Sequence, residues 1–245
     1  MAERVGSGWL RLRKLASIGT TPVLARALLR HRVAAGVEHR SVLTLLSSCA
    51  TVVDIGANRG QFALAARQCH PAASLEAFEP LPAPADVFQQ VFVDAPDVRL
   101  HRTAIGPERT QATMHVSARD DSSSVLPITA TQAALFSGTE EAGLATIEIG
   151  PLDQFLEPAR IHRPALLKID VQGFELQALQ GCESLLDQFT WLYVECSFIE
   201  LYEGQALADD VIAWLRERGF AVQGAYNVDY DTNGRAIQAD FLFGC

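Results

Sequence analysis

The chain has 245 residues, of which 49% are hydrophobic and 20% charged, and its formal net charge is −9. This length suits one α/β domain with a small appended element and allows a sizeable core. No apolar run approaches the 18 residues of a membrane span, and the N-terminus lacks the apolar core and cleavage site of a secretory signal. The acidic balance disfavours nucleic acid as a partner.

The cysteine content favours a reducing, cytoplasmic location. The five cysteines are odd in number and none has C-x-x-C spacing, which argues against a disulfide framework and against a structural zinc site. We expect most of them to be small buried hydrophobic residues.

Residues 1–48 are expected to form an N-terminal helical extension. Apolar residues recur at helical spacing from residue 8 onward, with Gly19 and Pro22 as a break. Residues 1–40 hold eight basic and two acidic residues, whereas the rest of the chain has a formal charge of −15. We interpret this segment as helix packed on the main domain. Contact with an anionic membrane surface, with an acidic substrate or with a second subunit in a homo-oligomer stays open.

Residues 49–245 alternate strand and helix signals, which predicts a single domain. The first part predicts strands in "VVDI", "ASLEAFEP" and "VRLHRTAIG", with helices over 61–69 and 84–93 between them. Strands over 111–117 and 145–149 follow, and the polar stretch between them is expected to be a lid or substrate loop.

The second part predicts strands in "ALLKID" and "TWLYVEC", with a helix over 174–186 between them. An amphipathic helix over 206–218 follows, with Gly219 as its C-cap. Two strands around 220–229 and 237–243, joined by "DTNG", close the chain as a hairpin. This order predicts a mainly parallel sheet with helices on both faces.

A glycine turn follows the first strand, in "VVDIGANRG". The strand ends in Asp54, and Gly56, Asn58 and Gly60 lead into a helix, so backbone N–H groups are free to contact a ligand. A nicotinamide dinucleotide site would need the spacing G-x-G-x-x-G, which Asn58 and Gln61 break. Asparagine tolerates left-handed backbone angles, so Asn58 can replace the middle glycine.

Glu79 is predicted to hold a ribose. It lies 23 residues after Gly56, at the end of the second strand, where a carboxylate can accept hydrogen bonds from both ribose hydroxyls. A glycine turn followed by such an acid indicates an adenosine-containing ligand, and the short G-x-N-x-G form favours S-adenosylmethionine over a dinucleotide. A turn that only packs the strand on the helix is the alternative.

The segment "LLKIDVQGFE" gathers charged residues at the end of an apolar strand. Side chains alternate along a strand, so Lys168 and Asp170 share the face that opens on a ligand crevice. Glu175 falls in the first turn of the next helix, where a carboxylate gains from the helix dipole. These groups could bind and deprotonate a hydroxylated substrate, and a buried ion network is the alternative.

Two further ionisable residues are candidates for the same site. Glu195 ends the strand "WLYVEC" and faces the crevice if that strand neighbours "LLKID". His115 titrates nearest neutrality, but a lone histidine in a strand is more often structural. An alcohol must lose its proton as it attacks a methyl group, so we expect Asp170 to be the base and Glu175 or Glu195 to orient the acceptor. Lys168 would set their charge.

The sequence does not indicate a metal. Asp170, Glu195 and two sugar hydroxyls could share a divalent cation, but no dedicated ligand motif is present. The segment "DDSSSVLP" offers hydroxyls and carboxylates that suit a polyhydroxylated substrate, and a solvated surface loop is its alternative interpretation.

Six segments together resemble the FkbM family of S-adenosylmethionine-dependent methyltransferases: "VVDIGANRGQFAL", "AFEP", "LHRTAIG", "DSSSVLP", "LKIDVQGFELQALQG" and "VECSF". The resemblance runs from about residue 50 to residue 243. It implies the α/β, Rossmann-like fold of class I methyltransferases, with a mainly parallel seven-stranded sheet, helices on both faces and a C-terminal antiparallel hairpin. It also implies S-adenosylmethionine as cofactor and methyl transfer to a hydroxyl of a sugar, a glycan or a polyketide.

The resemblance implies roles for particular residues. In chain order, the positions around the cofactor would be Asp54, Gly56, Ala57, Asn58, Gly60, Glu79, Ala104 and Ile105. Glu79 would hold the ribose, and Ala104 and Ile105 would lie near the adenine. Asp170 and Glu175 would stand at the methyl-transfer centre.

Other functions are weaker interpretations of the same residues. A non-catalytic S-adenosylmethionine-binding protein that regulates or scaffolds a biosynthetic complex would not need Asp170, Glu175 and Lys168 together. A nicotinamide reductase is disfavoured by Asn58 and by the missing third glycine. Methylation of nucleic-acid bases is disfavoured by the acidic body and by the absence of a Pro-Pro-aromatic corner in "KIDVQG".

Overall fold

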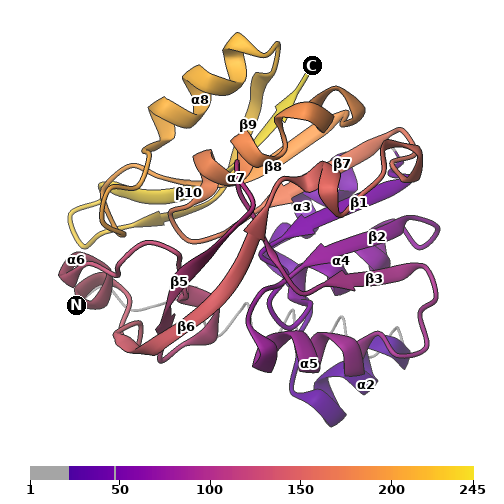
Figure 1. Ribbon diagram of the computed structural model, residues 1–245, viewed down its shortest axis with the longest axis horizontal. Helices are drawn as coiled ribbons and strands as arrows, with labels where there is room; N and C mark the ends of the chain where they lie inside the picture. Colours follow the sequence, from indigo (N-terminus) through magenta and orange to yellow (C-terminus); the bar gives the residue numbers. More distant parts are fainter. Residues whose placement is uncertain (1–21, 47) are drawn as a thin grey trace.

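The computed structural model describes residues 22–46 and 48–245, and the helical stretch expected within residues 1–21 lies outside the described residues. A seven-stranded sheet forms the centre, in the order β3-β2-β1-β7-β8-β10-β9 (Figure 1). Its strands are β1 (Thr51–Ile55), β2 (Ser74–Phe78), β3 (Val98–His101), β7 (Ala165–Ile169), β8 (Trp191–Ser197), β9 (Ala221–Tyr230) and β10 (Ala236–Gly244). The first five strands in this order are parallel, and β10 is antiparallel to both of its neighbours. The predicted mainly parallel sheet with a C-terminal hairpin is confirmed.

Helices pack on both faces of this sheet, as predicted (Figure 1). One face is covered by α2 (Pro22–His31), α3 (Arg40–Leu45), α4 (Gln61–Cys69) and α5 (Pro82–Val91). The other face is covered by α7 (Glu175–Gly181) and α8 (Ala208–Glu217). Two separate cores result because successive residues of a strand point to opposite faces: Val52 belongs to the first core and Val53 to the second.

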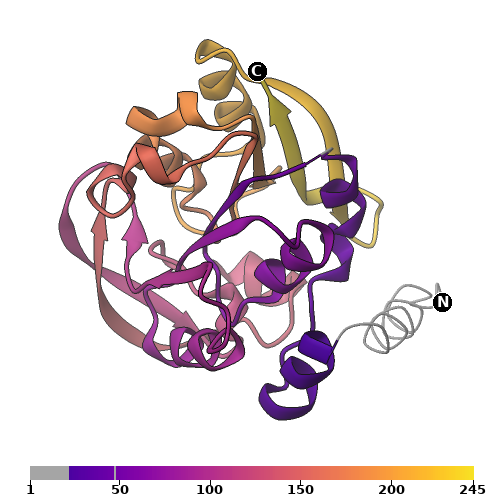
Figure 2. The ribbon, with the colours of Figure 1, turned by 90° about the vertical axis from the view of Figure 1, so that its right-hand side faces the viewer.

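The described part of the N-terminal extension packs on the first of these faces. Leu24 and Ala27 of α2 and Val42 and Leu43 of α3 are buried in the core that α4 and α5 share. Figure 2 shows α2 at the margin of the molecule, where Leu29 is 80% exposed. The interpretation of this segment as helix packed on the domain therefore holds from Pro22 onward.

A second sheet of three strands was not predicted. It consists of β4 (Ala104–Ile105), β5 (Thr110–Ser117) and β6 (Glu141–Gly150), in the order β4-β6-β5. The prediction of one strand through "VRLHRTAIG" was wrong, because the chain leaves the main sheet after His101 and pairs with β6 from Ala104. Buried Thr103 supports this change of sheet, since its hydroxyl donates to the Glu148 carbonyl at 3.1 Å.

Short helices fill the connections. The stretch between β5 and β6 is not only loop, because it contains the helix α6 (Ala130–Leu135), capped by the Thr129 hydroxyl. The 3-10 helices are η1 (Val37–His39), η2 (Asp120–Ser122), η3 (Leu152–Gln154), η4 (Pro158–Arg160) and η5 (Glu183–Gln188).

The helix predicted over 174–186 is an α-helix in its first half and a 3-10 helix in its second half. The Cys182 N–H is shared by the carbonyls of Ala178 and Leu179, at 3.1 and 3.0 Å. A shared N–H of this kind is common where an α-helix tightens. Residues beyond Cys182 therefore continue as the 3-10 helix η5.

Glycines with left-handed backbone angles lie close to the predicted turns, and most cysteines are buried, as expected. The C-cap of α8 is Arg218, and Gly219, predicted as the C-cap, is the next residue, with φ of +87°. Gly234 has φ of +81° in the turn between β9 and β10. All five cysteines are free, and Cys49, Cys182 and Cys196 are buried. No helix of the described residues is long and apolar enough to cross a membrane.

We expect Gly181→Ala to destabilise the protein, although alanine is the better helix former by about 1 kcal/mol. A methyl group at this position would lie 2.5–2.8 Å from backbone atoms of Gly106, which cannot move aside like the end of a side chain. Overpacking of this kind costs roughly 1–3 kcal/mol. Urea unfolding measures the loss. Gly143→Ala is the matched control, because a methyl group there meets nothing within 4 Å, and equal midpoints for the two variants would contradict the close packing.

Candidate active site

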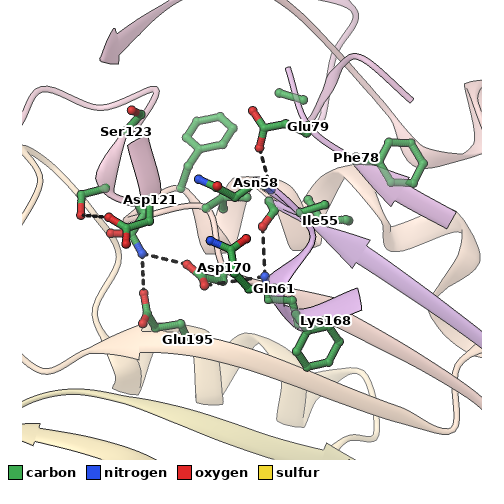
Figure 3. A pocket seen from close by; sticks show the side chains of 18 of the residues that line it. Ile55, Asn58, Gln61, Phe78, Glu79, Asp121, Ser123, Lys168, Asp170 and Glu195 are labelled. Carbon is green, nitrogen blue, oxygen red and sulfur yellow. Dashed lines mark hydrogen bonds and ion pairs between the residues drawn. The ribbon is translucent and has the colours of Figure 1, made fainter. Parts of the chain in front are cut away.

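A cavity of about 670 Å³ lies at the carboxyl ends of the parallel strands (Figure 3). Residues that directly follow β1, β2 and β7 line it, among them Gly56, Glu79 and Asp170. The order of the strands along the chain reverses between β1 and β7. Open α/β sheets bind their ligands at such a reversal, so this cavity is the candidate site.

The opposite wall of the cavity is formed by residues 104–150, which we call the roof. The roof residues that line the cavity are Ala104, Ile105, Met114, Arg119, Asp121, Ser122, Ser123, Val125, Gln132 and Phe136. Ala104 and Ile105, expected near the adenine, are therefore part of the wall. The segment "DDSSSVLP" also contributes to it, and Ser122 and Ser123 are buried.

Three residues with left-handed backbone angles shape the turn between β1 and α4. Gly56, Asn58 and Gly60 have φ of +79°, +47° and +94°, so Asn58 adopts the conformation expected of it. The turn lies close to the end of β7, because a Cβ at Gly56 would be 1.9 Å from the Asp170 carbonyl oxygen. Any side chain at position 56 would push the two corners of the site apart.

Glu79 connects this turn to the end of β2. Its Oε2 accepts a hydrogen bond from the Asn58 N–H at 2.9 Å, and its Oε1 accepts one from the Leu81 N–H at 2.8 Å. The residue lines the cavity (Figure 3). It is 5% exposed. Burial raises the pKa of Glu79 to about 7, although both backbone hydrogen bonds favour the ionised form. The charge of Glu79 therefore changes with pH near neutrality.

Strand register brings the charged residues together on one face of the sheet. Asp54 of β1 pairs with Lys168 of β7. Asp170 follows two residues after Lys168, and on the next strands Glu195 pairs with Asp240. Because side chains repeat every two residues along a strand, these groups share the face that α4 covers. The predicted common face of Lys168 and Asp170 is confirmed.

Lys168 lies at the centre of this group. Its Nζ is 3.1 Å from Asp54 Oδ1 and 3.6 Å from Asp170 Oδ2. It also donates to the Gly56 carbonyl at 3.1 Å and lies 5.5 Å from the centre of the Phe62 ring. Burial alone would lower the pKa of Lys168, but the two carboxylates raise it above its ordinary value. The lysine is therefore a buried cation, 4% exposed, with its partners around it.

The amide of Gln172 bridges two of the predicted catalytic residues. Its Nε2 donates to Asp170 Oδ1 and to Glu195 Oε2, both at 2.8 Å (Figure 3). The Asp170 side chain is 30% exposed and lines the cavity. Burial raises the pKa of Glu195 well above its ordinary value, and the charge of Asp170 raises it further.

Within residues 22–46 and 48–245, no three His, Cys, Asp or Glu side chains are arranged to hold a metal ion. Asp170 and Glu195, the two acids considered for a shared cation, have the amide hydrogens of Gln172 between them. Hydrogens of this kind carry partial positive charge, so hydrogen-bond donors already engage one oxygen of each of these two carboxyl groups.

Glu175 and His115 are not among the described residues that line the cavity. Glu175 is buried, and its Oε1 accepts hydrogen bonds from the N–H groups of Val171 at 3.1 Å and Gly173 at 3.0 Å. Burial raises its pKa to about 7. His115 lies on β5 of the roof, where its ring is hydrogen-bonded to the Glu141 carboxylate on β6. Their catalytic roles stay predictions, and these contacts favour structural roles.

The sequence analysis missed a second polar cluster in the cavity wall. Asp240 Oδ2 accepts hydrogen bonds from Tyr193 Oη at 2.8 Å and from Asn227 Nδ2 at 2.7 Å, and it lies 3.5 Å from His39 Nδ1. Burial would raise the pKa of Asp240, but these partners lower it below its ordinary value. Asp240 is marked in the sequence as a lone acid in an apolar strand. Nothing there marks His39, which belongs to the N-terminal extension.

Known proteins that are similar to this chain are methyltransferases. The family model described as "Methyltransferase FkbM domain" matches residues 54–222. The 2-O-methyltransferase NoeI of Sinorhizobium fredii is 29% identical over 174 residues, and the match covers 68% of this chain and 72% of the relative. Methyltransferase 1 of Beauveria bassiana is 26% identical over 186 residues, with coverage of 70% and 72%. The crystal structure of a candidate O-methyltransferase from Klebsiella pneumoniae has a TM-score of 0.51 at 16% identity, covers 97% and 96% of the two chains, and supports the fold.

We expect Lys168→Met to destabilise the protein by roughly 3–5 kcal/mol at neutral pH, because the buried carboxylate of Asp54 loses its cation. Burial raises the pKa of Asp54, so the folded variant binds that proton more tightly than the unfolded chain does. The loss should therefore be smallest below about pH 4, the ordinary pKa of aspartate, and grow as the pH rises above it toward neutrality. Urea unfolding across this range measures both effects.

The double variant Lys168→Met with Asp54→Asn is the control for this prediction. It removes the buried charge together with its cation, so it should recover most of the lost stability and most of the pH dependence. A double variant as unstable as Lys168→Met alone would contradict the importance of the ion pair.

Proposed function

This chain belongs to the FkbM family of methyltransferases, and we propose that it transfers the methyl group of S-adenosylmethionine to a hydroxyl of a sugar, a glycan or a related polyhydroxylated natural product. The observation that carries this proposal is a single cavity that has a glycine turn on one side and acidic side chains at strand ends on the other. The glycine turn and Glu79 stand on the β1–β2 side, and Asp170 and Glu195 stand on the β7–β8 side. A methyl donor and a hydroxyl acceptor need these two kinds of wall next to each other.

The wall beside the glycine turn suits S-adenosylmethionine, which when bound supplies an activated methyl group. The donor carries a positive sulfonium and an amino group, and Glu79, when ionised, gives this part of the cavity negative charge. We propose that Glu79 holds the ribose and that Ala104 and Ile105 lie along the adenine. For the methionine part we propose Gly56, Ala57 and Asn58, which line the cavity. Asp54, fully buried beside Lys168, and Gly60 were expected there too, but they are not among the lining residues, so we propose that they support the turn.

We propose Asp170 as the general base. Its carboxylate is open to the cavity, and Lys168, 3.6 Å away, balances its charge. Removal of the hydroxyl proton as the oxygen attacks typically contributes 10²–10⁴-fold to the rate. Glu195 has a raised pKa, so it can keep a proton and donate a hydrogen bond to a second hydroxyl of the acceptor.

Two observations support a hydroxylated acceptor. NoeI, the relative from Sinorhizobium fredii, is named as a 2-O-methyltransferase. Polar side chains also line the cavity from the roof and from β9 and β10, and together they could pair with several hydroxyl groups. These side chains are Asp121, Ser122, Ser123, Gln132, Asn227, Asp229 and Gln238.

We propose residues 49–245 as the methyltransferase domain and residues 1–48 as an extension that completes its site. The described part of the extension supplies Glu38 and His39 to the cavity wall. His39 reaches Asp240 of the last strand, so the extension closes the cavity beside the C-terminal hairpin.

Calorimetry with S-adenosylmethionine tests the donor site. Glu79→Gln should weaken binding by roughly ten- to a hundredfold, because the ribose loses a charged acceptor worth about 1.5–3 kcal/mol. Since the pKa of Glu79 is raised to about 7, wild-type affinity should increase between about pH 6 and pH 8, as the carboxyl ionises, and the variant should show no such increase. NADPH is the control ligand. Binding of NADPH in place of the methyl donor, or equal donor affinity in the variant, would contradict the proposed site.

Labelled S-adenosylmethionine with a panel of sugars and glycans tests the transfer. Asp170→Asn should lower kcat by roughly 10²–10⁴-fold and leave donor affinity nearly unchanged, because asparagine keeps the shape of the side chain but cannot take the proton. A protein that binds the donor and methylates none of the panel would instead support the non-catalytic alternative.

A further inference from the structure

Gln172 lies where two acidic side chains would otherwise face each other. Its Nε2 donates to Asp170 Oδ1 and to Glu195 Oε2, each at 2.8 Å. A primary amide has two N–H hydrogens, so each carboxyl group receives one. Two carboxyl groups that approach the same nitrogen atom repel each other when both are ionised, most strongly where protein replaces water. The amide holds this pair together.

A buried tyrosine determines which way the amide points. Tyr202 Oη lies 2.7 Å from Gln172 Oε1 and 3.2 Å from the Ser122 carbonyl oxygen, so its one hydrogen goes mainly to the nearer acceptor, Gln172 Oε1. The tyrosine is 2% exposed. Because Oε1 is engaged by this hydroxyl, Nε2 faces Asp170 and Glu195. Tyr202 Oη also accepts a hydrogen bond from Gln132 of α6 at 3.3 Å, which connects the amide to the roof.

The backbone of Gln172 has an unfavourable conformation for a glutamine. Its φ of +55° lies in the left-handed region, which asparagine and glycine adopt more readily. Asparagine is one methylene shorter and would not reach both carboxyl groups. Unfavourable conformations of this kind persist where the surrounding structure requires them. The three hydrogen bonds of the side chain therefore explain why glutamine occupies this position, because the backbone conformation alone would favour asparagine or glycine.

The carboxyl group of Glu195 depends on the donors around it. Burial raises its pKa, and neighbouring acids raise it further while Lys168 lowers it. Its other oxygen accepts a hydrogen bond from Gln238 Nε2 at 3.2 Å, which also reaches Asp229. The charged groups near enough to act on its charge are Lys168, Asp170, Glu175 and Asp240. Asp229 is connected to it through the Gln238 amide.

We propose that Gln172 is a positioning residue for methyl transfer: its amide spans Asp170 and Glu195 and holds Asp170 where it accepts the proton of the acceptor hydroxyl. This inference rests on the proposed function. As the oxygen–methyl bond forms and the sulfur–methyl bond breaks, the hydroxyl proton passes to Asp170, whose other oxygen stays 3.6 Å from Lys168. Gln172 exchanges no proton itself.

Two substitutions separate the side chain from the backbone. Gln172→Asn suits the left-handed backbone but is too short, so the free energy of unfolding should be unchanged or higher while kcat falls roughly ten- to a hundredfold. Gln172→Glu keeps the size and replaces the two donors by a third carboxyl group. Gln188→Glu is the matched control, because the Gln188 amide also donates to a carboxylate, that of Asp187 at 3.0 Å, outside the cavity.

Carbon-13 NMR of the carboxyl groups in the full chain measures the effect without any acceptor. The Glu195 signal, assigned with Glu195→Gln, should titrate about one pH unit or more higher in Gln172→Glu than in the wild type. It should not move in Gln188→Glu. With any acceptor that the sugar panel identifies, the pH profile of kcat should shift in the same direction.

An unchanged Glu195 titration in Gln172→Glu, or a wild-type kcat in Gln172→Asn, would overturn the positioning role. The two proposals can fail separately. If no sugar of the panel is methylated, the proposed function is contradicted, and the titration still decides whether Gln172 holds the acid pair.

Discussion

A lysine buried inside a parallel sheet is the constraint on which the site depends. A buried ammonium group is stable only where carboxylates and carbonyl oxygens surround it. Lys168 finds Asp54 on the neighbouring strand, Asp170 at the end of its own strand and the Gly56 carbonyl in the turn between β1 and α4. One side chain therefore joins two corners that are 112 residues apart in the chain. The donor side and the acceptor side of the cavity are placed relative to each other by these contacts.

The acids around this lysine differ because their hydrogen-bond donors differ. Glu79 and Glu175 each accept two backbone N–H groups, yet burial raises the pKa of both to about 7. Asp240 is also buried, but a tyrosine, an asparagine and His39 lower its pKa below the ordinary value. Glu195 has two glutamine amides and several acidic neighbours, and its pKa is raised. One acidic wall can thus contain groups that keep a proton beside groups that have lost it, which is what proton transfer to a base requires.

The alternation of strands and helices, the glycine turn and the common face of Lys168 and Asp170 could be predicted, because each follows from a short-range rule: the spacing of apolar residues, alternation along a strand, or left-handed angles at glycine and asparagine. The change of sheet after His101 could not, since it depends on Thr103 and Ala104 finding partners on β6, more than 40 residues later. Glu175 illustrates a third case. Its position in the first helical turn was evident, but its carboxylate faces its own turn and is not part of the cavity wall.

By itself the sequence determined the alternating α/β architecture, the glycine turn after β1, the charged residues at the end of β7 and the family of the chain. Each of these features depends on the spacing of residues along the chain. Tertiary structure alone decided which charged groups meet. His39 and Asp240 lie near opposite ends of the chain and contact each other only because β10 inserts between β8 and β9, next to the N-terminal extension. Nothing in "KIDVQG" indicates a role for Gln172, because its partners Tyr202 and Glu195 lie on other elements of the fold. Side-chain partners depend on distances in space, and no local pattern in the sequence records those distances.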